Sequence, residues 1–248
     1  DVSVNKVTID GATVGKEDCA STTAIDEASF GNGDVYGGYA LDAAKKASNN
    51  EVTWKSGDIK GNIYGGYVAG KAITGENNIL NVYHSSGSSS KTIAEGKSIA
   101  GFDRMNFYLS GDVKADSVII DNSNANAVKM DGVSVSLEND PDKPLDSDIV
   151  KGDKIYLIKK TEGSITPATT ELIANGLKYD FEVSTQDNAL IATSLNGKPN
   201  EETKALLEGH AAAALAVNQM VDNTINVALK DAELAAYDNA GADSANNN

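Results

Sequence analysis

Apolar and polar residues alternate in short stretches along most of the first 197 positions of the chain. The segments 52–54 and 80–82 each place one polar residue between two apolar ones. A period of two sends successive side chains to opposite faces, which predicts β-strands with one face against a core. Further strands are expected at 105–109, 118–120, 133–137, 155–158, 179–183 and 189–192.

Two blocks of the chain recur at the same spacing of 28 residues. Gly33–Tyr39 (GDVYGGY) returns as Gly61–Tyr67 (GNIYGGY), and Asn49–Trp54 returns as Asn77–Val82. Asn5–Ile9 resembles the second block. We expect the Gly-Gly pairs to form tight corners with positive φ, and the Asn pairs to bend the chain at the next corner. One repeat cannot bury its apolar face alone, so the copies must stack on one another.

Stacked copies predict parallel strands, with Val52 beside Leu80 and Tyr36 beside Tyr64. The predicted fold class is all-β: a right-handed parallel β-helix with a C-terminal β cap, followed by an α-helical linker. An antiparallel sandwich is the alternative, although it does not require near-identical corners at a fixed period. The expected domains are 1–120 for the rungs, 121–197 for the capping module, 198–235 for the linker helix and 236–248 for a disordered tail.

The periodicity changes from Glu201, where acidic residues open a helix that is rich in alanine and expected to run to about Leu234. Polar residues stand in its middle at Asn218, Gln219, Asp222, Asn223 and Asn226. A helix that faces lipid would not tolerate these groups. A helix inside a narrow polar pore would suit them, and an amphipathic helix on the protein's own surface is the alternative.

Composition narrows the function classes. The net charge of −15 works against binding to nucleic acid, because phosphate backbones need clustered cations. Aromatic residues make up only 6%, which disfavours an enzyme with a deep aromatic pocket. The single cysteine, Cys19, excludes an intramolecular disulfide and a zinc cluster, and it suits an oxidising compartment. No run of about 18 apolar residues is present, so no ordinary membrane-spanning helix is expected.

Residues with catalytic or metal-binding chemistry are few. His84 precedes Ser85 and Ser86, but adjacent residues in one loop seldom reach the geometry of a nucleophile and its base. An enzyme that cleaves polysaccharides would need two close carboxylates, for which the candidates are Asp34, Asp103 and Asp116. Calcium ligands could come from Asp140, Asp142, Asp146 and Asp148, although two prolines break any EF-hand spacing. We therefore expect no catalytic, cofactor or metal site.

The repeated tyrosines have two interpretations. Pointing inward, Tyr36, Tyr39, Tyr64 and Tyr67 would form ladders that fix the register. Pointing outward, one tyrosine of each pair would form a stripe able to stack on sugar rings or contact a host protein. In that second case Tyr39 and Tyr67 are the candidate ligand contacts.

Three motifs together resemble the carboxy-terminal passenger region of a classical monomeric autotransporter of the type V secretion class. They are Gly61–Tyr67, the strand Asn106–Leu109 and the segment Glu202–Gly209, which is followed by Ala-rich sequence and by Val217–Gln219. The resemblance covers nearly the whole chain, and the last motif is its most specific part. It implies a β-helical passenger, an autochaperone-like cap that seeds folding during secretion, and a linker helix that threads the pore of a translocator barrel.

The resemblance also sets the functional expectation. The chain would act as a rigid stalk or adhesin segment, without catalysis of its own, on the cell surface or outer membrane of a Gram-negative-type bacterium or after secretion, in attachment and virulence. Its partners would be its own C-terminal translocator barrel, expected beyond Asn248, a host surface protein or glycan, and a second copy of the chain. The alternative function is a secreted β-helical enzyme that degrades polysaccharides.

Overall fold

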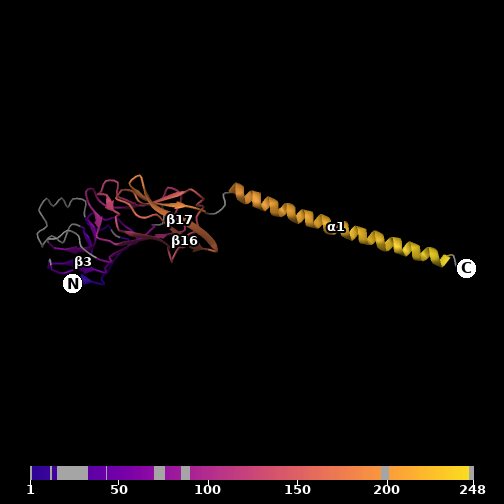
Figure 1. Cartoon of the computed structure of the whole chain (residues 1–248), viewed down its shortest axis with the longest axis horizontal. Coiled ribbons are helices and arrows are strands. Elements are labelled where there is room, and N and C mark those ends of the chain that lie inside the picture. Colours follow the sequence, from indigo (N-terminus) through magenta and orange to yellow (C-terminus); the bar gives the residue numbers. More distant parts are fainter. Residues whose placement is uncertain are drawn as a thin grey trace. The chain divides into compact units, whose positions relative to one another are not determined.

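A computed structural model describes residues 2–11, 13–15, 33–42, 44–69, 76–84, 90–196 and 201–245, with helix side chains at 209 and 212–233. The described part is mostly β, with one C-terminal α-helix (Figure 1). It divides into two compact units, Asp1–Lys198 and Pro199–Asn248. Cys19, Ser85 and Ser86 lie outside the described residues.

The first unit contains a five-stranded sheet in which every pair of neighbouring strands is parallel. Its strands are β2 (Lys6–Ile9), β5 (Glu51–Trp54), β7 (Ile79–Tyr83), β10 (Arg104–Leu109) and β13 (Ser134–Asn139). Val52 pairs with Leu80, which confirms the register predicted from the repeat. The resemblance of Asn5–Ile9 to the repeat is also confirmed, because β2 pairs with β5.

A second parallel sheet carries the Tyr-Gly-Gly-Tyr strands. Its strands are β3 (Val35–Ala40), β6 (Ile63–Val68) and β9 (Ile99–Ala100), and a separate parallel pair joins β1 (Val2–Ser3) to β4 (Ala47–Ser48). Tyr36 pairs with Tyr64, as predicted. The parallel direction of β3 and β6 excludes the antiparallel sandwich for these strands.

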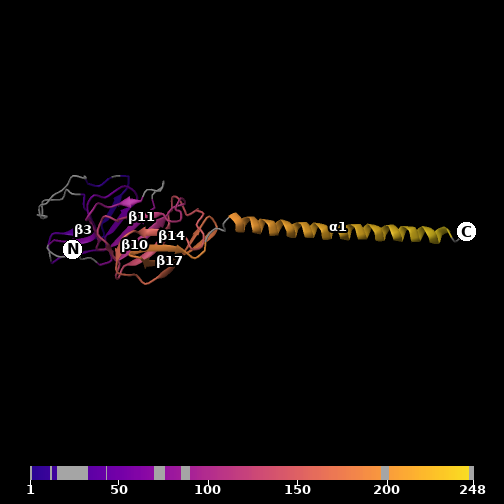
Figure 2. The ribbon, with the colours of Figure 1, turned by 90° about the horizontal axis from the view of Figure 1, so that it is seen from above.

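The remaining strands form a mixed six-stranded sheet and one further parallel pair. In sheet order the six strands are β16 (Ala168–Ala174), β17 (Leu177–Gln186), β18 (Ala189–Ser194), β14 (Lys154–Ile158), β11 (Val118–Asp121) and β8 (Lys91–Thr92). The separate pair is β12 (Val128–Lys129) with β15 (Thr161–Glu162). Parallel pairing therefore continues past residue 120, where the cap was expected to begin, and antiparallel pairing starts only where β18 joins β14. Figure 2 shows β11, β14 and β17 in the same part of the unit as β10.

One contiguous apolar cluster extends from Ile9 in β2 to Ala192 in β18. Trp54, Phe107 and Phe181 are fully buried within it. The alternation seen in the sequence therefore turns one face of the parallel strands inward, and the antiparallel strands share the same core.

The Gly-Gly pairs do not form the expected corners. Gly37–Gly38 and Gly65–Gly66 lie inside β3 and β6, and they are absent from the glycines with positive φ. Glycine is needed there for space, because a Cβ on Gly38 would lie 2.5 Å from the side-chain nitrogen of Asn50. The Asn corners are confirmed, since Asn49 and Asn77 have φ values of 57° and 60°.

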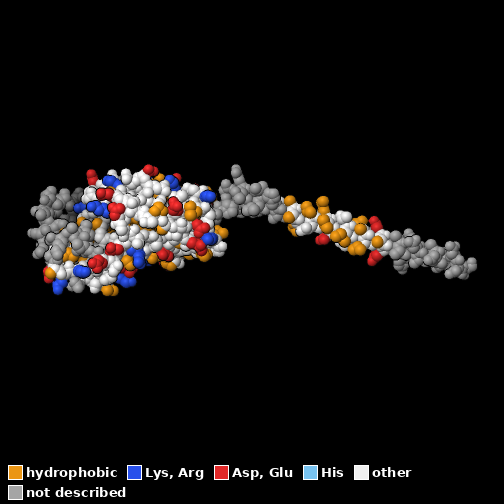
Figure 3. Space-filling view, in the orientation of Figure 1, with side chains coloured by type: hydrophobic (Ala, Val, Ile, Leu, Met, Phe, Trp, Pro, Cys, Tyr) orange, Lys and Arg blue, Asp and Glu red, His pale blue; other side chains and the backbone are white. Residues whose placement is uncertain are grey.

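The second unit contains α1 (Glu201–Ala245), a helix of 45 residues. It is longer than expected: it begins at the predicted residue but continues past Leu234, so the tail expected from residue 236 is helical as far as Ala245. Alanine-rich sequence favours this extension because alanine has the highest helix propensity. All described side chains of α1 are exposed, and Figure 3 shows apolar ones on its surface. Leu215 and Ile225 are two large apolar examples. None of the described helical residues forms a segment apolar enough to cross a membrane.

Candidate functional site

Four tyrosines from β3 and β6 form an aromatic cluster on one face of their sheet. Tyr39 and Tyr67, the two candidate ligand contacts, stack with ring centroids 5.3 Å apart and planes inclined by 15°. Tyr36 and Tyr64 lie 5.5 Å apart, and Tyr36 meets Tyr39 edge-to-face at 5.1 Å. All four residues are half-buried. We call this group the tyrosine cluster: equivalent tyrosines of β3 and β6 pair in register, as an aromatic ladder requires, but their rings are partly exposed instead of pointing inward.

The four tyrosines share one face because the alternation of buried and half-buried residues along β3 and β6 is interrupted at the glycine pairs. Regular alternation would place Tyr36 and Tyr39, three residues apart, on opposite faces. In β3 both glycines between them are buried and both tyrosines are half-buried, so the two rings meet on the same face. The expectation that only one tyrosine of each pair faces outward is therefore wrong. The buried side chain of Asn50, which packs against Gly38, accounts for the interruption.

Asp34 fixes the position of the cluster from the start of β3. Its Oδ1 accepts hydrogen bonds from the backbone N–H and the side-chain amide of Asn62, at 2.6 and 2.9 Å. Its Oδ2 accepts the hydroxyl of Tyr36 at 3.1 Å. Burial and then the charge of Asp34 raise the pKa of both Tyr36 and Tyr64. The phenols therefore stay neutral at physiological pH and can act as hydrogen-bond donors.

A second aromatic pair lies on the five-stranded sheet. Tyr83 of β7 and Tyr108 of β10 are register partners, and their rings stack at 4.2 Å with planes 6° apart. Lys55 Nζ lies 5.4 Å from the ring centre of Tyr83. Sequence reasoning did not select this pair, because these strands are offset by 25 residues instead of 28. The shared position of the two tyrosines near the ends of apolar strands was the only available signal.

His84 is buried, and its contacts with described residues lack the geometry of a catalytic triad. Its Nδ1 lies 2.6 Å from Ser110 Oγ and 3.5 Å from Asp112 Oδ1. Ser110 in turn donates its hydroxyl proton to Asp112. A Ser-His-Asp triad needs the serine and the carboxylate on opposite ring nitrogens, whereas here both lie at the same one. Burial lowers the pKa of His84, so the imidazole is neutral and serves as part of a buried polar cluster.

Two of the three candidate carboxylates, those of Asp34 and Asp103, accept hydrogen bonds from neighbouring repeats. Asp34 accepts the backbone N–H of Asn62 in the following repeat, and Asp103 accepts the backbone N–H of Asn78 in the preceding one, at 3.0 Å. Asp116 occupies a turn with a φ of 61°. The acids proposed as calcium ligands lie in one irregular segment, where Asp140 accepts the backbone N–H of Asp142. Across the described residues, no three His, Cys, Asp or Glu side chains lie close enough to hold a metal ion together.

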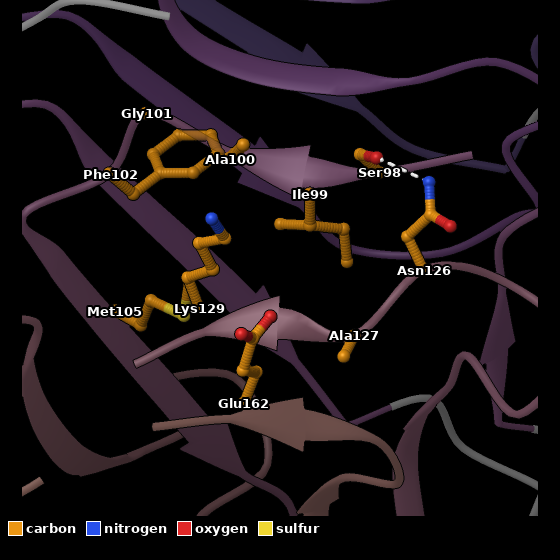
Figure 4. A pocket seen from close by; sticks show the side chains of 10 residues that line it. All are labelled: Ser98, Ile99, Ala100, Gly101, Phe102, Met105, Asn126, Ala127, Lys129 and Glu162. Atoms are coloured by element: carbon orange, nitrogen blue, oxygen red, sulfur yellow. Dashed lines mark hydrogen bonds between the residues drawn. The ribbon is translucent and has the colours of Figure 1, made fainter. Parts of the chain in front are cut away.

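A cavity of about 620 Å³ opens between β9 and β12 (Figure 4). Its apolar lining comes from Ile99, Phe102 and Met105. These three side chains are buried and also belong to the hydrophobic core. Lys129 and Glu162 contribute exposed charged groups. We call this cavity the β9–β12 cleft, and no sequence pattern had indicated it.

The cleft arises because the ladder of the second sheet breaks between β9 and β12. Among the described strands, β9 pairs only with β6, and β12 pairs only with β15. At one end the two segments remain joined, since the side-chain amide of Asn126 donates to Gly96 O and Ser98 Oγ, each at 2.9 Å. Beyond that clamp no strand pairing links Ile99–Ala100 to Val128–Lys129. The cleft lies at this separation, and core residues Ile99, Phe102 and Met105 form part of its lining.

Comparison of the chain with protein-family models, with curated proteins and with solved structures found no match. Function is therefore inferred from the chain's own residues.

Proposed function

We propose that this chain is a surface-displayed passenger segment of an autotransporter that acts as a rigid stalk or adhesin segment, with no catalysis of its own. The supporting observation is the parallel stacking of repeats that carry the same polar and aromatic side chains at equivalent positions. Asn50 pairs in space with Asn78, and Tyr39 with Tyr67, each at the same 28-residue spacing. Such stacking builds length without building a catalytic pocket.

The order of the strands supports a parallel β-helix. After β5 the chain passes a bridge at Ile59, then β6, and returns to the first sheet at β7. It then passes β8 and a bridge at Ile93, then β9, and returns again at β10. The same cyclic order continues through β11, β12 and β13. A chain that visits three faces in a fixed order describes a coil, and we assign it the right-handed sense that parallel crossover connections strongly favour.

A buried polar ladder would make this coil rigid. Asn50 Oδ1 accepts the side-chain amide of Asn5 at 2.8 Å, and Asn78 Oδ1 accepts that of Asn50 at 3.1 Å. Asp103 continues the series by accepting the backbone N–H of Asn78. Each bond joins one repeat to the next, so bending or shearing the coil would break several buried bonds together.

The tyrosine cluster is the surface best suited to attachment. Tyrosine offers a large rigid apolar face together with a hydroxyl, a combination enriched where proteins bind one another. The rings of Tyr39 and Tyr67 present this surface from two successive repeats. A host protein or a glycan whose sugar rings stack on the aromatic faces is the ligand that we propose.

The end of the chain has the parts that an autotransporter passenger would need. The antiparallel strands β16 to β18 join β14 through β18 and so cover the edge of the parallel strands β8, β11 and β14. We propose that they act as a folding cap, and that α1 leads into the pore of a translocator barrel. There its mid-helix Asn, Gln and Asp groups would meet polar walls, and the protein would belong to the outer membrane of a Gram-negative-type bacterium.

Surface display is tested in a Gram-negative host that expresses the complete reading frame. Protease added to intact cells should remove the segment that contains residues 1–197, while a cytoplasmic marker survives. Cleavage that occurs only after cell lysis would contradict display.

Attachment is tested with beads coated with the purified chain. The double substitution Tyr39→Ala and Tyr67→Ala should reduce binding of the beads to host cells or to a glycan array. The matched control is Tyr156→Ala, because Tyr156 is also half-buried but lies on β14, where it contacts Lys159 instead of the cluster. Equal loss in both variants would refute a role for the cluster. New reducing ends released from a polysaccharide would favour the alternative of a degrading enzyme.

A further inference from the structure

We propose that the β9–β12 cleft binds a free α-amino acid with a bulky apolar side chain. This role lies beyond that of a stalk, because it concerns a small-molecule site within the wall of the coil. The cleft has the volume of an ordinary ligand site, at about 620 Å³. Its chemistry divides into an apolar floor and a charged rim.

The floor suits an aliphatic or aromatic side chain. Ile99, Phe102 and Met105 line it while belonging to the continuous core of the unit. In Figure 4 these three side chains border the space between β9 and β12. A side chain placed there would contact the core directly, and its transfer from water would supply the main favourable free energy of binding.

The rim carries one positive and one negative group. Lys129 of β12 and Glu162 of β15 are register partners on neighbouring strands, and both are exposed. Figure 4 shows the Lys129 ammonium group inside the space beside Phe102, and the Glu162 carboxylate directed toward the same space. Within the described part of the chain, no ion pair joins the two groups. They are therefore available to a ligand.

Unlike charges on one rim select a zwitterion. The carboxylate of an α-amino acid would meet Lys129 and its ammonium group would meet Glu162, while the side chain enters the floor. A polyanion would find one cation opposed by one carboxylate, and a fatty acid would leave Glu162 without a partner. A neutral sugar would use neither charge and would leave the apolar floor unfilled.

The shape of the cleft is built into the backbone. The Asn126 clamp joins the two segments at one end, and Gly101, with a φ of 74°, turns the chain out of β9 immediately after two paired residues. β9 has two residues while β6 has six, so only Ile63 and Tyr64 of β6 pair with β9. The cavity therefore does not depend on movement of a loop.

The test measures binding of L-leucine and L-phenylalanine to the purified chain by calorimetry. Two derivatives accompany leucine: N-acetyl-leucine lacks the positive charge, and leucine amide lacks the negative one. Lys129→Met should weaken leucine about tenfold without affecting leucine amide, because the amide cannot use the lysine. Glu162→Gln should weaken leucine by a similar factor without affecting N-acetyl-leucine. Both residues are exposed, so neither substitution should disturb folding.

The control variant is Lys151→Met, which removes an exposed lysine from a turn that does not line the cleft. It should bind leucine as the unmodified chain does. The absence of binding at about 10 mM amino acid, roughly the weakest affinity that calorimetry resolves, would overturn the proposal. Equal affinity for leucine and both derivatives would also overturn it, as would tighter binding of a leucine peptide blocked at both ends.

Discussion

Replacement of Asn78 by alanine should be among the most destabilising single changes in the parallel sheets. Asn78 is completely buried between two repeats. Its Oδ1 accepts the backbone N–H of Asn50 at 3.0 Å and the side-chain amide of Asn50 at 3.1 Å. Its Nδ2 donates to the carbonyl of Ala47 at 3.1 Å. Alanine would remove all three bonds and leave their partners buried without a replacement.

The magnitude follows from the number of groups left unpaired. A hydrogen bond contributes about 1 kcal/mol net, and a buried polar group without a partner costs about 1–3 kcal/mol. Loss of the three bonds made by the Asn78 side chain should therefore lower the free energy of unfolding by about 3–5 kcal/mol. This is a large part of the ~5–15 kcal/mol that stabilises a typical domain.

The assay is urea unfolding followed by the fluorescence of Trp54, the only tryptophan in the chain. Trp54 is fully buried in β5 of the same sheet, so its emission should shift when the repeats separate. The matched control is Asn124→Ala, because Asn124 is exposed in a turn. That control should change the free energy of unfolding by less than about 0.5 kcal/mol. If Asn78→Ala and Asn124→Ala unfold at the same urea concentration, the polar ladder does not stabilise the stack.

Four further predictions concern packing, pH, the cap and the helix. Gly66→Ala should destabilise the fold, since the added Cβ would lie 2.1 Å from the backbone oxygen of Ala47. Gly209→Ala places its Cβ within 4 Å of no atom beyond the neighbouring helix backbone and should stabilise α1, because alanine has the higher helix propensity. Thermal unfolding followed by circular dichroism measures both effects. Burial lowers the pKa of Lys91 from 10.5 to about 8, so the unfolded chain binds this proton more tightly than the folded one. The free energy of unfolding should therefore increase as the pH rises from about 8 to 10.5. Urea titrations at several pH values should show this increase, and Lys91→Met should abolish it. Deletion of residues 121–197 should leave the preceding strands sensitive to protease, and full resistance would argue against a templating cap. Ala213→Trp should hinder surface display of the full-length protein while leaving the unfolding midpoint of this chain unchanged, and normal display would count against a narrow pore.

Several features of the fold follow from sequence periodicity. The 28-residue spacing predicts the pairing of Val52 with Leu80 and of Tyr36 with Tyr64, because stacked coils place equivalent residues side by side. The left-handed conformation at Asn77 was also predictable, since asparagine adopts it more readily than most residues. These are properties of local sequence, repeated along the chain.

The corners of the coil show where sequence reasoning went wrong. A Gly-Gly pair commonly marks a turn, yet Gly65–Gly66 lies within a strand because Asn78 of the next segment and the carbonyl of Ala47 occupy the space of a side chain. That crowding comes from residues 12 and 19 positions away from Gly66 in the chain. Only the folded structure reveals it.

The candidate sites depend on tertiary structure to an even greater degree. The sequence identified Tyr39 and Tyr67, but the meeting of all four tyrosine rings follows from the interrupted alternation over Asn50. Lys91 is buried and His84 contacts Ser110, but both residues lie outside the 28-residue repeat, so its spacing could not predict either feature.

The sequence by itself determined the β-rich character, the parallel register and the helix that starts at Glu201, because each is encoded by the spacing of apolar, glycine and asparagine residues. The tertiary structure alone decided the β9–β12 cleft. Hydrogen bonding between repeats is a long-range property. β9 pairs with β6 and β12 pairs with β15, but no ladder joins β9 to β12, and the wall opens between them.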